Sequence, residues 1–126
     1  DGDSYVYFEK ANIIHTGDIM FNKMFPYIDL NAGGSVAGYI KAVEHMLSHM
    51  NGDTKVMPGH GVVASKNDVE GFLSMLKETR KIVLDRKAIG DSLEEVKKQG
   101  LGEKWKSWSW SFINEEKWIA TLYDGR

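Results

Sequence analysis

The sequence places an amphipathic helix between two short apolar strands, and this order limits the chain to folds in which helices pack on a sheet. Apolar residues recur at intervals of three and four from residue 36 to residue 50, after the capping residue Ser35 and before Asn51-Gly52. Strands are predicted before this helix, ending at Ile13-Ile14, and after it, at residues 55–57. A strand, helix, strand order predicts a layered α/β fold.

The residues before the helix predict a hairpin and a loop. An apolar segment at residues 4–8 is separated from Ile13-Ile14 by the polar residues 9–12, which favours a β-hairpin. Residues 19–34 have neither helical nor alternating periodicity, so we expect a long ordered loop there. Ordered loops of that length usually carry a function.

The second half of the sequence predicts helices. Each begins at a capping signal, and these are Ser65 with Asp68 for a helix to about residue 87, Asp91 with Glu94 for a shorter helix to about residue 100, and Asn114 for a last helix to residue 122.

All four tryptophans lie in this helical half, at Trp105, Trp108, Trp110 and Trp118. Three interpretations are open: hydrophobic cover over a sheet, an aromatic subsite for a ligand, or an interfacial membrane contact. Hydrophobic cover is favoured, because each aromatic side chain buries about 150–250 Å². If the segment from Trp108 to Phe112 is extended, its alternate aromatic rings lie on one side.

Composition excludes several classes of function. The 126 residues are enough for one domain, and a net charge of −2 gives no reason to expect nucleic acid as a partner. Without cysteine, any metal site depends on His, Asp and Glu. No apolar run is long enough to span a membrane, and the cellular compartment stays open.

Two motifs carry metal-binding residue types next to predicted strands. His15-Thr16-Gly17-Asp18 is expected to follow the second strand, and Pro58-Gly59-His60-Gly61 is expected to form a rigid turn after the third. Ligands bind α/β sheets at the ends of strands. A carboxylate that bridges two cations and a neutral imidazole together suit zinc, iron or manganese.

The order of these features resembles the C-terminal half of metallo-β-lactamase-fold hydrolases. The resemblance covers about half of the chain, from residue 1 to residue 65, and its features are a strand pair, Gly17-Asp18, a loop with Phe25, Pro26 and Asp29, a helix start at Gly33-Gly34-Ser35, and Pro58-Gly59-His60-Gly61. It implies half of an αββα sandwich: a mixed β-sheet with helices on one face, plus a helical, Trp-rich C-terminal extension. Residues 1–64 would be the core with the metal-ligand motifs, and residues 65–126 the helical part.

The resemblance also implies a dinuclear zinc centre in a longer parent protein. In that family the Asp that matches Asp18 bridges two metals, and the His that matches His60 binds the second metal. The other ligands, an H-x-H-x-D-H run and a third-motif His, are not in this sequence. We therefore expect a fragment that is inactive alone, from a β-lactamase-like or cyclase-like hydrolase of a small molecule. Lactams, thioesters, lactones and phosphoesters all stay open as substrates.

Four further residues are candidates near such a centre. His15 lies three positions before Asp18 and is either a hydrogen-bonding neighbour of that ligand or a partly buried strand residue. Phe25, Tyr27 and Asp29 lie where the family has part of its pocket wall, and simple loop packing is an equal alternative. His45 and His49 share one helix face, where a solvent-exposed surface is favoured over metal binding.

An alternative of a different class is a non-catalytic unit that associates with itself. Half of a sandwich would expose an apolar sheet face larger than a monomer normally tolerates. Two copies could cover that face by pairing sheet on sheet, so a homodimer is expected.

Overall fold

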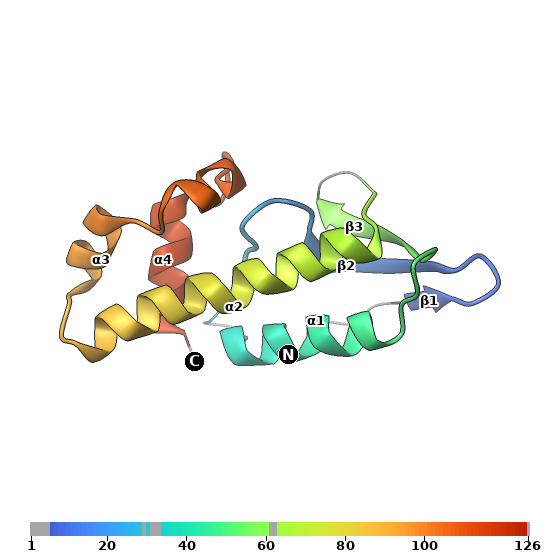
Figure 1. Cartoon of the computed structure of the whole chain (residues 1–126), viewed down its shortest axis with the longest axis horizontal. Coiled ribbons are helices and arrows are strands. Elements are labelled where there is room, and N and C mark those ends of the chain that lie inside the picture. Colours follow the sequence, from blue (N-terminus) through green and yellow to red (C-terminus); the bar gives the residue numbers. More distant parts are fainter. Residues whose placement is uncertain (1–5, 29, 31–33, 61–62, 126) are drawn as a thin grey trace.

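A mixed β-sheet and a set of helices make up the fold. The computed structural model describes residues 6–28, 30, 34–60 and 63–125, and the side chains of residues 6, 17–20, 59 and 60 lie outside this description. In chain order its elements are β1 (Val6–Phe8), β2 (Ile13–Phe21), α1 (Val36–Ser48), β3 (Lys55–His60), α2 (Lys66–Ala88), α3 (Leu93–Gln99), the 3₁₀-helix η2 (Glu103–Trp108) and α4 (Glu115–Asp124) (Figure 1).

The described strands form one sheet in the order β1-β2-β3. β1 is antiparallel to β2, which confirms the predicted hairpin, and β3 is parallel to β2. The parallel pair is connected through α1, as the strand, helix, strand order predicts. The mixed sheet and the α/β class are therefore confirmed.

The helices cover one face of this sheet. Ile14 and Val56 are paired in register and completely buried, and both α1 and α2 contact β2. Their neighbours His15 and Met57 are also paired and are exposed. Because successive strand residues point to opposite faces, the second face of the sheet is open to solvent.

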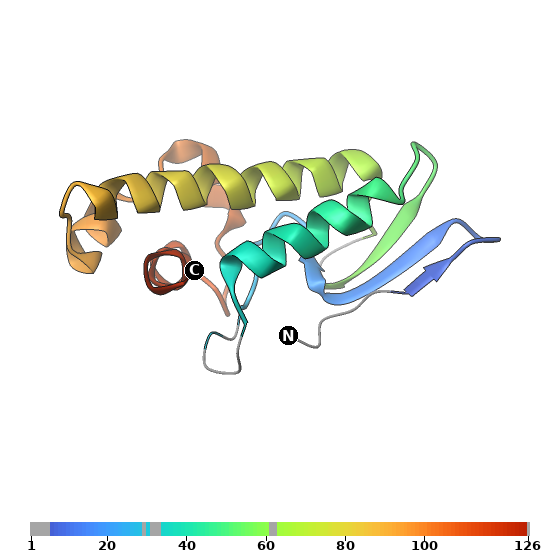
Figure 2. The same ribbon diagram turned by 90° about the horizontal axis from the view of Figure 1, so that it is seen from below.

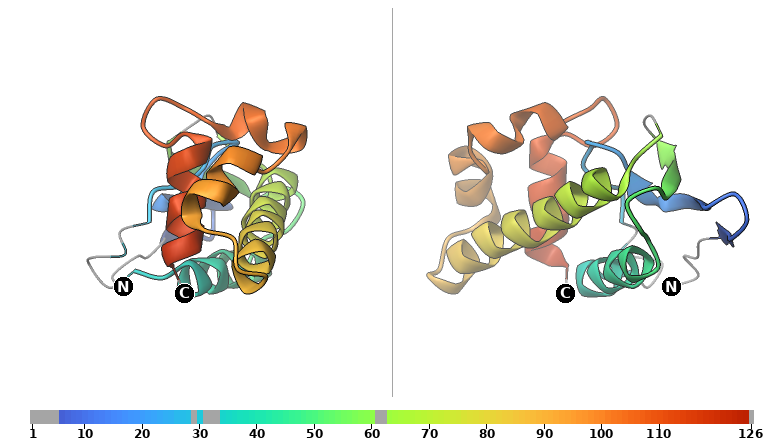
Figure 3. Two further views of the ribbon diagram at one scale, coloured as in Figure 1. Left: turned by 90° about the vertical axis from the view of Figure 1, so that its left-hand side faces the viewer. Right: turned by 45° about the vertical axis from the view of Figure 1, so that its right-hand side comes forward.

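The long helix α2 connects the two ends of the molecule. The sheet lies at one end of α2, and α3 and α4 lie at the other (Figures 1 and 2). α4 crosses α2 at a steep angle and contacts both α2 and α3 (Figure 3). None of the described helices is both long and apolar enough to span a membrane.

Capping residues explain where the helices begin. The side chain of Ser35 accepts a hydrogen bond at the start of α1, and Ser65 and Asp68 form a reciprocal capping box at the start of α2, both as predicted. Asn114 caps α4.

The predicted start of α3 is wrong by one residue. The N-cap is Ser92, whose partner in the capping box is Glu95, rather than Asp91 with Glu94. A serine hydroxyl accepts the N3 amide here, and the Asp91 carboxylate instead lies 3.8 Å from the guanidinium of Arg86.

Both strands that carry the candidate motifs run further than predicted. β2 continues through Gly17-Asp18 to Phe21, so this motif lies within the strand and the loop begins after it. β3 continues through Pro58-Gly59-His60, which is therefore strand rather than a turn, and Gly61 lies outside the described residues. Each extension depends on the other strand, because parallel pairing continues as far as Phe21 and His60.

The tryptophans of the C-terminal region pack mainly over α2 and the loop after β2. Trp118 is completely buried and stacks on Phe25, and Trp108 stacks on Phe72 of α2. Trp108 ends the 3₁₀-helix η2, so the segment from Trp108 to Phe112 is not extended throughout. Hydrophobic cover is thus the main role of these rings, over helix and loop.

Candidate metal centre

The parallel pairing of β2 with β3 brings the two candidate motifs onto neighbouring strands. Gly17 is the register partner of Pro58, and Phe21 is the partner of His60. Asp18 lies between these two paired positions on β2. The backbone positions of Asp18 and His60 therefore share the edge at which both parallel strands end, where α/β sheets bind ligands.

The register between the two strands is irregular along this stretch. Six residue steps on β2, from His15 to Phe21, face only three steps on β3, from Met57 to His60. Extra residues of this kind bulge out of the ladder and re-aim side chains, and bulges are common beside active sites. Regular pairing of Ile13 and Ile14 with residues 55 and 56 precedes the irregular part.

Pro58 is compatible with its strand because β3 lies at the edge of the sheet. Proline donates no backbone hydrogen bond, so an edge strand tolerates it where a central strand would not. Met57 precedes Pro58, and its carbonyl oxygen accepts a 3.4 Å hydrogen bond from the hydroxyl of the buried Thr16. This bond helps to hold β2 against β3.

The donor set at this strand edge fits part of a zinc centre. A carboxylate and an imidazole are two of the ligand types that zinc prefers. The side chains of Asp18 and His60 lie outside the described residues, and the described side chains contain no group of three or more His, Asp or Glu suited to a metal ion. Asp18 and His60 are therefore two residues of suitable type at this strand edge, too few on their own for a closed zinc site.

His15 lies on the open face of the sheet. Its backbone is paired with Met57 on one side and with Val6 on the other, and its side chain is exposed. It therefore does not belong to the core that α1 and α2 cover.

The three loop candidates differ in their surroundings. The Phe25 ring is completely buried and lies 5.9 Å from the Trp118 ring, so it packs in the core. Tyr27 is 47% exposed, and its ring packs in a T-shaped arrangement with the Phe112 ring, with ring centres 5.6 Å apart. Asp29 lies outside the described residues.

The aromatic neighbours of Tyr27 come from the far end of the sequence. The Phe112 and Trp110 rings lie 5.7 Å apart, and Phe112 is 53% exposed. An aromatic subsite in this region is one of the interpretations that the sequence leaves open, but no sequence signal joins it to Tyr27. Their contact depends on tertiary structure alone.

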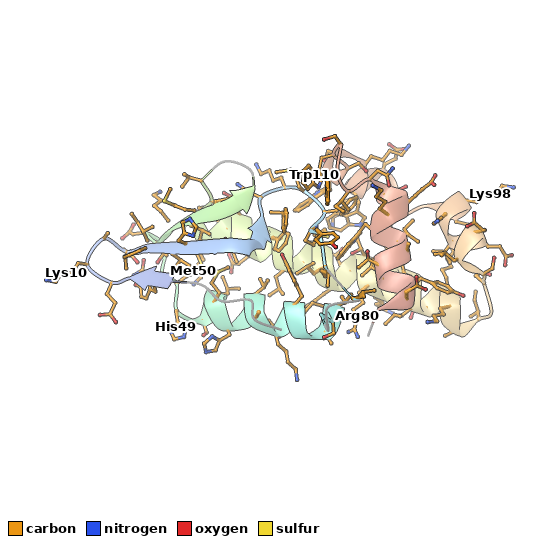
Figure 4. The ribbon with its side chains drawn as sticks, turned by 180° about the vertical axis from the view of Figure 1, so that it is seen from behind. Lys10, His49, Met50, Arg80, Lys98 and Trp110 are labelled. Atoms are coloured by element: carbon orange, nitrogen blue, oxygen red, sulfur yellow. The ribbon has the colours of Figure 1, made fainter. Side chains whose placement is uncertain are left out.

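Two other clusters lie away from the strand ends. The exposed His45 and His49 rings have their centres 4.8 Å apart. His49 lies at the carboxyl end of α1 (Figure 4). A cleft of about 350 Å³ lies between α1 and α2, and its lining residues are Ile40, Lys77, Arg80, Lys81, Leu84 and Asp85. Two of its lysines are ion-paired, Lys77 with Glu44 and Lys81 with Asp85, both at 2.8 Å.

Comparison with known proteins gives no family assignment. No protein-family model matches the chain, and no curated protein sequence matches it significantly.

Proposed function

We propose that this chain is part of a dinuclear, metal-dependent hydrolase of the metallo-β-lactamase superfamily, in which Asp18 and His60 are metal ligands. The observation that carries the proposal is the parallel pairing of β2 with β3. This pairing supports it because the Gly-Asp and Pro-Gly-His motifs, which are far apart in sequence, then end at one edge of the sheet.

Each residue has a distinct role in the proposed centre. When metal is bound, the Asp18 carboxylate, which has two oxygens, would hold two cations, and the imidazole of His60 would provide one further ligand. Zinc bound there supplies Lewis-acid activation of a carbonyl or phosphoryl group. Because these 126 residues contain no H-x-H-x-D-H run, we expect the chain alone to bind metal incompletely and to lack hydrolase activity.

Metal content tests the proposal directly. The purified chain is loaded with zinc, dialysed and analysed by mass spectrometry of its metals, together with Asp18→Ala and His60→Ala. The expected result is bound zinc in the wild type and its loss in both variants. The control is the double variant His45→Ala/His49→Ala, because this exposed pair at helical spacing could bind zinc independently.

Two outcomes would contradict the proposal. Zinc that survives both Asp18→Ala and His60→Ala but disappears in the His45→Ala/His49→Ala variant would assign the metal to α1. A chain that holds no zinc after dialysis would favour a structural role over a metal site.

A structural role is the second candidate, and the open face of the sheet favours it. Phe8 and Met57 are 54% and 44% exposed, and both alternate with residues that face the helices. Ile13, the register partner of Phe8, is half-buried on the same face. A second copy that pairs through this face would bury all three side chains in a homodimer.

A further inference from the structure

Four aromatic rings form a continuous row from the end of β2 to the surface. The ring centres are 6.1 Å apart for Phe21 and Trp110, 5.7 Å for Trp110 and Phe112, and 5.6 Å for Phe112 and Tyr27. Phe21 is buried and Trp110 half-buried, while the last two rings are about half exposed. We call these four residues the aromatic row.

Hydrogen bonds fix the middle of the aromatic row. The indole Nε1–H of Trp110 donates to the Phe25 carbonyl oxygen at 2.8 Å, and its backbone N–H donates to the carbonyl oxygen of Ile113 at 3.0 Å. Trp110 therefore lies beside the segment that follows β2 (Figure 4). A surface held in place in this way loses little conformational entropy when a ligand binds.

The aromatic row begins at the proposed metal-ligand edge. Phe21 is the register partner of His60 and lies three residues after Asp18 on β2. Three residues of a strand span about 10 Å, so the backbone of Asp18 and the start of the row lie within the length of a small molecule, and such a molecule meets the row at its exposed rings, Phe112 and Tyr27.

A cation lies at the exposed end of the aromatic row. The Lys117 ammonium donates to the Phe112 carbonyl oxygen at 3.1 Å and lies 5.7 Å from the centre of that ring. No carboxylate among the described residues forms an ion pair with it. An apolar surface with a cation at its end complements a ligand that has both an aromatic ring and a negative charge.

We infer that the aromatic row binds the non-reacting part of the substrate, and that this part is an anionic aromatic group. The inference rests on the proposed function, because a molecule bound to the aromatic row is a substrate only if a metal centre at the neighbouring strand edge reacts with it. The row supplies stacking surface and Lys117 supplies charge, so neither needs a metal ion for binding.

Binding of phenylacetate to the metal-free chain in EDTA tests this inference. The four indole N–H signals are followed by two-dimensional NMR during titration with phenylacetate, with acetate and with benzyl alcohol. We expect phenylacetate to shift the Trp110 signal and to bind at least about fivefold more tightly than the other two compounds. The Trp118 signal, from a completely buried ring, is expected to stay in place.

Surface variants separate the contributions of ring and charge. Phe112→Ala is expected to weaken phenylacetate binding about fivefold, and Lys117→Ala to reduce it to the level of benzyl alcohol. The control Ile89→Ala changes an apolar residue that is 74% exposed at the end of α2, and it should leave binding unchanged. Both ring and control variants lie on the surface, so the fold tolerates them.

The inference is overturned if phenylacetate does not shift the Trp110 signal, or if Phe112→Ala binds it as well as the wild type does. Failure of the proposed function has a different signature. If zinc binds through Asp18 and His60 but phenylacetate does not bind, only the role of the aromatic row is rejected. If phenylacetate binds but zinc does not, only the metal centre is rejected.

Discussion

The indole Nε1–H of Trp118 donates a 3.0 Å hydrogen bond to the hydroxyl oxygen of Thr79, and both side chains are completely buried. The same hydroxyl donates to the Met75 carbonyl oxygen at 2.6 Å, so donor and acceptor capacity are both used. A buried polar pair of this kind fixes the position at which α4 crosses α2.

Substitution of Trp118 should show how much this pair stabilises the fold. Trp118→Phe removes the donor and leaves a small cavity, and we expect the free energy of unfolding to fall by about 2–4 kcal/mol. Thr79→Val should cost about 1–2 kcal/mol. Urea unfolding followed by circular dichroism measures both, and the double variant should lose less than the two single losses together. Strict additivity would show that the hydrogen bond contributes nothing.

Two residues with left-handed backbone should respond oppositely to glycine. Asn12 has a φ of 55° and bonds through its side chain to Tyr7, Asn51 and Thr54, whereas Lys23 has a φ of 58° and an exposed side chain. Asn12→Gly loses three hydrogen bonds and should destabilise the protein by about 2 kcal/mol. Lys23→Gly relieves backbone strain and should stabilise it by about 0.5–1 kcal/mol. Thermal unfolding of the two variants compares them, and a stabilising Asn12→Gly would contradict the role of the network.

The capping box of α3 predicts a pH dependence. The Ser92 backbone N–H donates to the Glu95 carboxylate, and this hydrogen bond is the main cause of a lowered pKa of Glu95. A hydrogen bond from the Ser92 hydroxyl lowers the pKa of Glu95 further. Since the folded pKa lies below the unfolded one, the stabilisation is complete above the ordinary glutamate pKa and is lost as the pH falls through the lowered value. An NMR titration of the Glu95 side chain should show this shift.

Ser92→Ala is the variant that checks the cause. It removes the hydroxyl but keeps the backbone N–H, so the Glu95 pKa should rise part of the way and the start of α3 should fray. A Glu95 pKa that is the same in Ser92→Ala and in the wild type would contradict the role of the Ser92 hydroxyl.

The open sheet face predicts an oligomer that a single charge disrupts. If two copies pair through this face, the wild type should be a dimer by light scattering, and Met57→Glu should be a monomer because it buries an unpaired charge in the interface. Ile89→Glu, at the far end of α2, should leave the dimer intact. A wild-type monomer would reject self-association through this face.

The helices were predictable because their signals are local. Ser35 and Ser65 are capping residues at the positions where α1 and α2 begin, and the apolar spacing that follows each cap lies within one element. The one-residue error at α3 has a local cause as well. Asp91 and Ser92 are both good caps, and only the hydrogen bond from Glu95 distinguishes them.

The strand ends were not predictable, because they depend on pairing between distant residues. Nothing near Asp18 or Pro58 shows that β2 and β3 continue, and a glycine beside each favours a turn when read alone. The candidate site has the same limit. Sequence identified the residue types at Asp18 and His60, whereas their shared edge and the contact of Tyr27 with Phe112 depend on tertiary structure.

Two backbone hydrogen-bonding groups of Phe25 have partners that are synthesised much later than Phe25 itself. The Phe25 backbone N–H donates to the Trp108 carbonyl oxygen, and its own carbonyl accepts from Trp110, which follows it by 85 residues. During synthesis the hairpin and α1 leave the ribosome long before these partners exist. The loop beside the strand ends therefore completes its packing late, after the C-terminal aromatic residues have been made, so the region we assign to substrate is among the last to assemble.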